Sequence, residues 1–203
     1  FSVYDLLADE RLPLSSTVMP TNITGMNLIP SHPDLAAAEL ELLNVIERER
    51  RLDDKLSRSQ PLPYDYVIID CPPALNILSI NILVASSALV IPIEPHPLSL
   101  MVLKRLFETV ERVKRLNPRL EVIGFLPTKV HHSSRLAVDM LETLTERFPN
   151  LPLLPSIPLS VKSAESIAES TSILQYMPHS SISAAYREAA AFIEQRIGSV
   201  AHV

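Results

Sequence analysis

The chain has 203 residues, a formal net charge of −5 at pH 7 and a single cysteine. A length of this order suits one domain with one substantial core. The negative balance gives no overall attraction to nucleic acid, and one cysteine excludes an intrachain disulfide framework and is typical of a reducing cytoplasm. No uninterrupted apolar run approaches the ~18 residues that a membrane-spanning helix needs.

Predicted helices alternate with short apolar strands along the chain. The first predicted helix covers residues 34–55, where leucines share one side and charged residues the other. Further helices are predicted over residues 76–85, 98–116, 134–147, 163–169 and 183–197, and strands over 66–69, 89–93, 122–126 and 153–157. This alternation predicts an α/β fold, with a mostly parallel central sheet covered by helices on both faces.

The most informative segment is residues 64–73, YDYVIIDCPP, where an apolar run with β-branched residues stops at Asp70. The run predicts a strand buried on both faces. In open α/β sheets, ligands bind beyond the carboxyl ends of the strands, so an aspartate there can hold a metal ion or its water shell. The local pattern fits equally well an aspartate that ends a strand and caps a turn. No glycine-rich anion loop surrounds Cys71, which we interpret as a small buried thiol.

Residues 64–95, YDYVIIDCPPALNILSINILVASSALVIPIEP, closely resemble the central segment of the ParA/MinD family of partitioning and positioning ATPases. That family has a strand of the form YDxIIIDxPP, a helix rich in small and apolar residues, and a second strand that runs into proline. Other segments match the family in the same order, namely residues 3–7, 25–30, 98–116, 122–128, 154–165 and 183–197. The resemblance covers nearly the whole chain and implies a P-loop NTPase-like fold.

Two family features are missing from these 203 residues: the signature phosphate loop KGGxGKT and a second strand with a DxDPQ-like ending. Gly25, Gly124 and Gly198 are the only glycines, and none adjoins another. A phosphate cradle needs glycines because its backbone N–H groups must all turn toward the anion. We therefore expect a truncated domain, with a strand, the phosphate loop, its helix and another strand upstream of Phe1. The alternative is a family member that has lost its nucleotide site.

The resemblance implies a role for three residues around the strand end. In the intact family, ATP lies between two sandwiched subunits, and Asp70 would bind the water shell of Mg²⁺. Pro72 and Pro73 resemble the switch-region prolines that couple γ-phosphate occupancy to the dimer surface. These roles come from the resemblance and not from the local pattern.

The resemblance also implies where the adenine would lie. It would be near Thr128, for which a strand-end cap is an equally good interpretation. The other implied adenine neighbours are Ile157, Pro158 and Leu159. Glu94 and His96 follow another predicted strand end and could face the same pocket, but no partner for His96 is evident, so we interpret it as a solvated turn residue.

The sequence gives weaker signals for a metal ion, DNA and a membrane as further partners. His131 and His132 are adjacent histidines without a third spaced ligand, so a solvated loop is favoured over a metal site. Some family members bind DNA nonspecifically through basic side chains. For the basic residues of this chain we prefer ordinary solvation of helix faces. The candidates are Arg112, Lys114, Arg115, Arg119, Arg135 and Lys162. The MinD branch uses a C-terminal amphipathic membrane helix, but Glu188, Glu194 and the scarcity of basic residues argue against one here.

The sequence thus predicts the C-terminal portion of a ParA-like ATPase. Its cycle of ATP binding, dimerisation and hydrolysis would position DNA or another large cargo, and a partner protein would stimulate it. Without a phosphate loop, the chain alone is expected to be inactive. One alternative is a nucleotide-free scaffold or adaptor that keeps only the fold and the dimer surface. Another is an unrelated α/β enzyme that uses Asp70 with a different cofactor.

Overall fold

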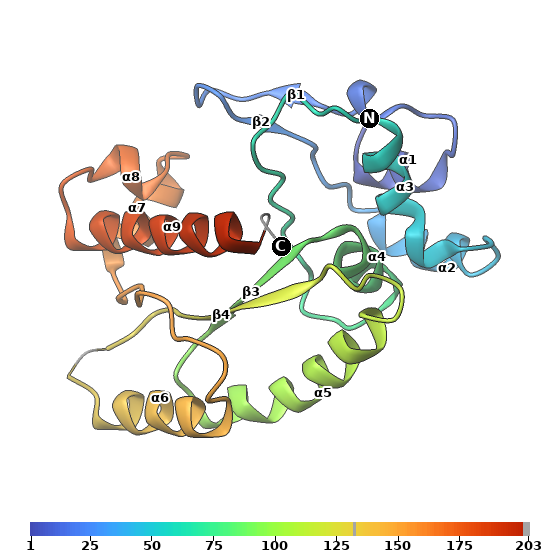
Figure 1. The fold of residues 1–203 in the computed structure, drawn as a ribbon. Helices are drawn as coiled ribbons and strands as arrows, with labels where there is room; N and C mark the ends of the chain where they lie inside the picture. Colours follow the sequence, from blue (N-terminus) through green and yellow to red (C-terminus); the bar gives the residue numbers. More distant parts are fainter. Residues whose placement is uncertain (132, 201–203) are drawn as a thin grey trace. The chain divides into compact units, whose positions relative to one another are not determined.

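The computed structural model describes residues 1–131 and 133–200, the last two without their side chains. The chain divides into two compact units, whose elements are labelled in Figure 1. Unit 1 comprises Phe1–Ser87 and Glu108–Leu120, and unit 2 comprises Ala88–Phe107 and the chain from Glu121 onward. Over the described part of the chain, no helix has both the length and the apolar composition to cross a bilayer.

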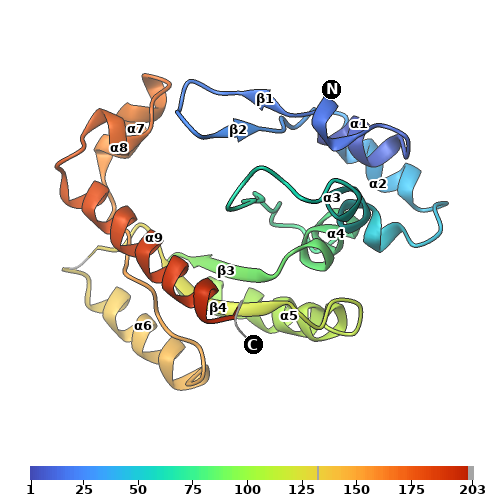
Figure 2. The same cartoon turned by 45° about the horizontal axis from the view of Figure 1, so that its top comes forward.

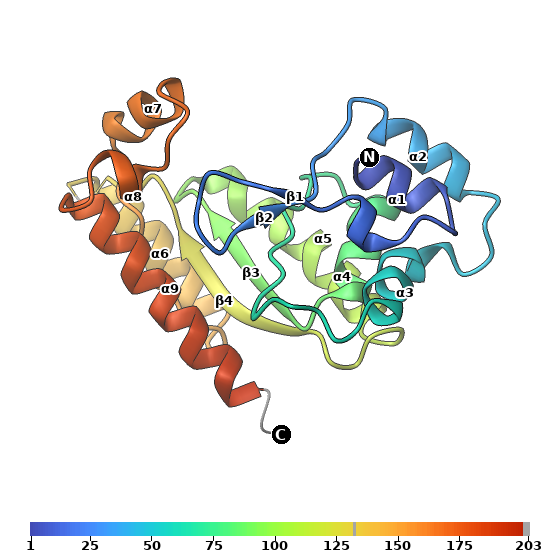
Figure 3. The same cartoon turned by 90° about the horizontal axis from the view of Figure 1, so that it is seen from above.

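Unit 1 consists of short helices around one apolar cluster and a small hairpin. Its helices are α1 (Val3–Ala8), α2 (Leu35–Leu42), α3 (Arg51–Arg58) and α4 (Ile77–Ala85), with 3-10 turns η1 (Leu14–Ser16) and η2 (Arg48–Arg50). The antiparallel hairpin is formed by β1 (Met19–Pro20) and β2 (Asn27–Leu28) (Figure 3). Helices α1 and α2 lie side by side (Figure 2). They pack with α4 through the buried side chains of Leu7, Ala38, Leu42 and Leu78.

The prediction of one helix over residues 34–55 is wrong, because α2 and α3 are separated by a turn and by η2. Glu47 has a left-handed backbone with φ 55°, a conformation that ends an α-helix. The buried Asn81 of α4 then fixes the start of α3. Its Oδ1 accepts a hydrogen bond from the N–H of Leu52 at 3.1 Å, and its Nδ2 donates to the carbonyl of Arg48 at 2.7 Å. A contact across 29 residues sets this break, so the local pattern could not show it.

The prediction of a buried strand over residues 66–69 is also wrong. This segment forms neither a helix nor a strand and has no ladder partner among the described residues. Its apolar side chains face solvent: Tyr66 is 52% exposed, Val67 51% and Ile68 94%. A strand is buried only when other strands pair with its edges and helices cover its faces. The described residues of unit 1 provide neither for this segment.

Unit 2 contains the parallel part of the sheet. Strands β3 (Ala88–Ile93) and β4 (Glu121–Pro127) pair in parallel, with Ile91 opposite Phe125. The predicted extended segment 153–157 continues the sheet beyond β4. The N–H of Phe125 donates to the carbonyl of Pro152 at 3.0 Å, and the N–H of Leu154 donates to the carbonyl of Phe125 at 2.8 Å. Three neighbouring parallel segments therefore run side by side in this unit.

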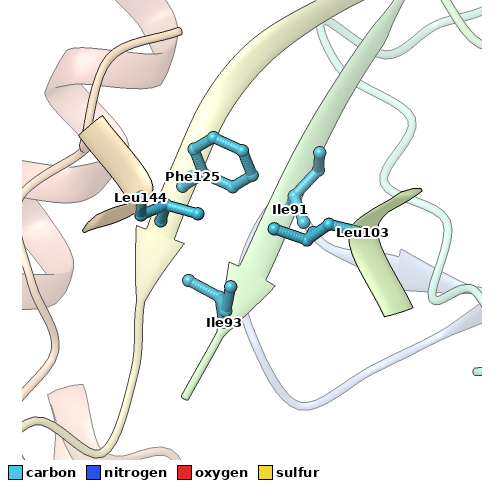
Figure 4. Close-up of a cluster of buried hydrophobic side chains, with 5 residues drawn as sticks. All are labelled: Ile91, Ile93, Leu103, Phe125 and Leu144. Carbon is cyan, nitrogen blue, oxygen red and sulfur yellow. The ribbon is translucent and has the colours of Figure 1, made fainter. Parts of the chain in front are cut away.

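One face of this sheet is covered by α5 (Pro97–Val113) and α6 (Arg135–Arg147). Figure 4 shows the cluster that joins them: Ile91 and Ile93 of β3, Phe125 of β4, Leu103 of α5 and Leu144 of α6. Phe125 has none of its surface exposed and Leu144 only 1%. The alternation of strand side chains puts every second residue of each strand on this face.

The opposite face is covered by α9 (Ser181–Val200), which contributes Ile182, Ala185 and Ala189 to a cluster around the buried Ile157. Leu126 packs against that cluster, as expected for the residue next to Phe125. Two short helices, α7 (Val161–Ala168) and α8 (Ile173–Tyr176), precede α9. The predicted fold class, an α/β fold with parallel strands and helices on both faces, is confirmed.

Candidate functional site

Asp70 lies at the end of the apolar segment 66–69 in unit 1, and it is exposed rather than buried in an apolar interior. No hydrogen bond or ion pair to its carboxylate is found among the described residues. The described residues also contain no group of three His, Cys, Asp or Glu side chains that could hold a metal ion directly. An isolated exposed carboxylate of this kind suits a bond to a water of a hydrated cation better than a place in a closed metal cage.

The loop after Asp70 is anchored on the N-terminus of α4. Asn76 caps this helix, because its Oδ1 accepts hydrogen bonds from the N–H groups of Leu78 at 3.1 Å and Ser79 at 3.2 Å. Ser79 is fully buried, and its hydroxyl donates to the carbonyl of Ala74. The cap therefore fixes the end of the loop that carries the predicted switch prolines.

The structure keeps Pro72 and Pro73 in the same loop as Asp70, where Pro72 is half-buried and Pro73 is exposed. Cys71 is exposed, so the prediction of a buried thiol is wrong. Protein atoms packed near its sulfur nevertheless raise the pKa of the thiol by desolvation. A hydrogen bond with Ser79 lowers that pKa, and the charge of Asp70 raises it. The pKa of the thiol therefore depends on both the Asp70 carboxylate and the Ser79 hydroxyl.

The predicted adenine residues come together in unit 2, at the carboxyl ends of parallel segments. The N–H of Thr128 donates to the carbonyl of Ile93 at 2.8 Å, which holds Thr128 beside the end of β3. The N–H of Val130 donates to the carbonyl of Ile157 at 3.1 Å, and the N–H of Leu159 donates to the carbonyl of Val130 at 3.1 Å. Exposure to solvent increases along residues 157–159: Ile157 is buried, Pro158 is half-buried and Leu159 is exposed.

An ion pair between Glu94 and Lys129 occupies the same edge of unit 2. Glu94 follows β3 directly, and Lys129 follows β4 with a left-handed backbone of φ 52°. This pair could not be predicted from the sequence, because only the parallel register of β3 and β4 brings the two strand ends together. His96 is an exposed turn residue, as predicted, and its Nδ1 accepts a hydrogen bond from the N–H of Leu98 at 3.3 Å.

The remaining candidates are the paired histidines and the basic side chains. His131 is exposed, and His132 lies outside the described residues. The basic residues are divided: Arg112, Lys114, Arg115 and Arg119 belong to unit 1, and Arg135 and Lys162 to unit 2. Lys114 pairs with Glu111 at 3.3 Å and Lys162 with Glu165 at 2.7 Å. These pairs offset positive charge, which favours the interpretation of solvated helix faces.

Sequence comparisons link the chain to partitioning proteins. The AAA domain family matches residues 1–122. Over 179 residues the chain is 35% identical to the sporulation initiation inhibitor protein Soj of Bacillus subtilis, covering 88% of this chain and 70% of Soj. Over 165 residues it is 34% identical to the chromosome partitioning protein ParA of Myxococcus xanthus, covering 81% of this chain and 58% of that protein. The chain thus spans less than two thirds of the length of several relatives.

Three solved structures are similar to this chain. Cobyrinic acid a,c-diamide synthase from Mycobacterium smegmatis, with bound ADP and magnesium, matches with a TM-score of 0.73 and 34% identity over 83% of this chain and 67% of that chain. Apo McdA from Cyanothece matches with a TM-score of 0.83 and 22% identity over 95% and 77%. The cell division ATPase MinD of Pyrococcus furiosus matches with a TM-score of 0.73 and 20% identity over 96% and 76%. The last two show a shared fold.

Proposed function

The chain belongs to the ParA/MinD family of P-loop ATPases, and we propose that it is the C-terminal portion of an enzyme that binds and hydrolyses ATP in a dimer. That enzyme would partition or position DNA or another large cargo, as the names of relatives such as ParA suggest. It would work in the cytoplasm, and a partner protein would stimulate its cycle.

The observation that carries this proposal is the position of Asp70. Its carboxylate is exposed at the end of an apolar run, and the next residues form a loop anchored on α4. That arrangement leaves the carboxylate free to bind a water of hydrated Mg²⁺, and it supports a switch role for Pro72 and Pro73. Bound Mg²⁺ would supply positive charge where negative charge accumulates on the transferred phosphoryl group.

The residues at the strand ends of unit 2 fit the base of a nucleotide. Thr128 offers a hydroxyl that can pair with a purine edge, while Pro158 and the exposed Leu159 offer apolar surface for the ring faces. The hydrogen bonds that join residues 128–130 to 157–159 would hold these groups in fixed positions. ADP and magnesium in the related synthase support ATP and Mg²⁺ as the ligands.

The exposed run at residues 66–69 supports a further part of the proposal. Unpaired backbone groups beside apolar side chains form an edge that another strand can join. We place that strand, together with the family's phosphate loop, in sequence outside these 203 residues. The chain alone would then lack the amides and lysines that bind phosphates, and it would not hydrolyse ATP.

The test compares ATP hydrolysis by this chain with hydrolysis by the full product of the gene that encodes it. We expect Mg²⁺-dependent hydrolysis by the full product and none above background by the chain alone. A nucleotide-free scaffold or adaptor predicts no hydrolysis by either, with dimerisation that does not respond to ATP. An unrelated α/β enzyme predicts that the chain alone binds a metal ion and that Asp70→Asn abolishes this binding. Either of the last two results would overturn the ATPase proposal.

A further inference from the structure

A hydrogen-bonded network connects α2 with the loop that follows Asp70. Glu39 of α2 accepts a hydrogen bond from Nδ2 of Asn76 through its carboxylate oxygen Oε1. The other side of the Asn76 amide, Oδ1, caps α4 by accepting from the N–H groups of Leu78 and Ser79. Ser79 continues the network toward the loop, because its hydroxyl donates to the carbonyl of Ala74.

The network is more than a helix cap. A cap needs only the oxygen of residue 76, which an aspartate or serine also provides. The amide adds a donor, and that donor goes to a carboxylate on a different helix. Glu39 and Asn76 are both half-buried, and Ser79 is fully buried, which limits competition from water. The position of the loop is therefore tied to α2 as well as to α4.

We propose that Asn76, held by Glu39, is a positioning residue that fixes the loop carrying Asp70, Pro72 and Pro73. This inference deepens the proposed function, on which its relevance to ATP hydrolysis rests. In that enzyme α2 would set the position of the metal-shell carboxylate through Glu39 and Asn76, and a change in α2 would reach the nucleotide site by this route. The network itself does not depend on nucleotide and is testable without it.

Cys71 provides the readout, because it is the only cysteine in the chain and is next to Asp70. Its thiol is exposed, but protein atoms packed near the sulfur raise its pKa and so reduce the reactive thiolate. The rate at which a neutral disulfide reagent labels the thiol therefore reports how closely the loop is packed. Asn76→Asp keeps the capping oxygen but replaces the donor to Glu39 with a second carboxylate. We expect labelling about fivefold faster, the factor that one hydrogen bond of ordinary net strength represents. The added charge alone would raise the pKa of the thiol and slow labelling, so a faster rate reports a looser loop.

The double variant Glu39→Gln/Asn76→Asp exchanges donor and acceptor, since the amide introduced on α2 can donate to the new carboxylate. We expect it to label within about twofold of the unmodified chain, because the hydrogen bond is restored. The single variant Glu39→Gln keeps an oxygen that accepts from Asn76 and should also stay near the unmodified rate. Glu41→Gln is the matched control on the same helix, where the carboxylate contacts Tyr4 instead.

Thermal unfolding is measured for every variant, because aspartate caps helices as well as asparagine and should leave stability nearly unchanged. If Asn76→Asp does not fold, Glu39→Ala replaces it; this variant leaves the α4 cap intact and should also label faster. The proposal is overturned if the variant lacking the Glu39–Asn76 bond labels no faster than the unmodified chain. It is overturned equally if the exchange variant labels as fast as Asn76→Asp. Neither result depends on whether the enzyme hydrolyses ATP.

Discussion

Of two apolar runs of similar composition in this molecule, one is a paired and buried strand and the other is unpaired and exposed. In unit 2, β4 pairs in parallel with β3 on one edge and bonds with residues 152–154 on the other, and Phe125 at its centre is fully buried. In unit 1, residues 66–69 form no strand with any of the described residues, and Ile68 is 94% exposed. Both runs suit a strand by composition. Their difference shows that neighbouring segments decide whether a strand is formed and buried.

Truncation of one residue in each run should separate the two regions most clearly. Phe125→Ala should lower the free energy of unfolding by about 3–5 kcal/mol, because it leaves a cavity between β4 and the helices α5 and α6. Ile68→Ala should change it by no more than about 0.5 kcal/mol, since the side chain is already in water. Chemical denaturation of each variant measures both values. Equal losses would mean that residues 66–69 are buried in solution.

A second substitution tests the close packing between β4 and residues 152–154. Gly124 has φ 150°, and a Cβ there would lie 2.5 Å from the carbonyl oxygen of Pro152 and 2.7 Å from Cδ1 of Leu154. Gly124→Ala should therefore cost about 1–3 kcal/mol of unfolding free energy, through strain and a forced shift of the neighbouring segment. Gly198→Ala in α9 is the matched control, because a Cβ there meets nothing within 4 Å. Equal melting temperatures for the two variants would contradict this account of the sheet.

In unit 1, a few buried polar side chains hold distant segments together through hydrogen bonds, and Lys55 is the clearest case. It is 5% exposed, and its Nζ donates to the carbonyls of Asp9 at 2.7 Å, Glu10 at 2.9 Å and Leu12 at 2.6 Å. Lys55→Met leaves these carbonyls without their donor and should cost about 1–3 kcal/mol. Arg58→Met, on the exposed side of the same helix, should have little effect. Denaturation midpoints that do not separate the two variants would refute this role for Lys55.

The smallest expected effect concerns pH and the capping box of α1. The hydroxyl and N–H of Ser2 donate to the Asp5 carboxylate at 2.8 and 2.7 Å, and they lower its pKa below the ordinary value of 3.8. Because the folded pKa is the lower one, this contribution to stability is complete above the unfolded value. It is lost as pH falls through the folded pKa. The stability difference between the unmodified chain and Asp5→Asn should therefore shrink in acid; a difference that grows there would contradict the cap.

Much of the fold was predictable from local pattern. The predicted helix over residues 76–85 became α4, with Asn76 as its cap, and the strands over 89–93 and 122–126 became β3 and β4. The failures have one physical origin, which is the dependence on distant partners. The break between α2 and α3 follows from the contacts of Asn81, and the exposure of residues 66–69 follows from the lack of a pairing strand among the described residues.

The candidate site shows the same division. The exposed position of Asp70 between an apolar run and two prolines follows from local features of the sequence, whereas the predicted strand before it is not formed. Hydrogen bonds of Val130 hold the chain after Thr128 beside residues 157–159, and the adenine role that family resemblance implied for these residues stays a prediction. By contrast, the Glu94–Lys129 pair and the Glu39–Asn76 hydrogen bond join residues 35 and 37 positions apart. No spacing rule connects such positions, so only the structure could reveal them.

The most direct test of the account is the Mg²⁺ dependence of ATP hydrolysis by the full gene product, compared between Asp70→Asn and Asp65→Asn. Asp65 is a matched exposed aspartate five positions upstream in the same segment. We predict that Asp70→Asn weakens Mg²⁺ activation or activity by about 10–100-fold, as loss of a group that orients metal-bound water does, and that Asp65→Asn changes neither. If both variants respond to Mg²⁺ like the unmodified enzyme, Asp70 does not hold the metal shell and the central claim is wrong.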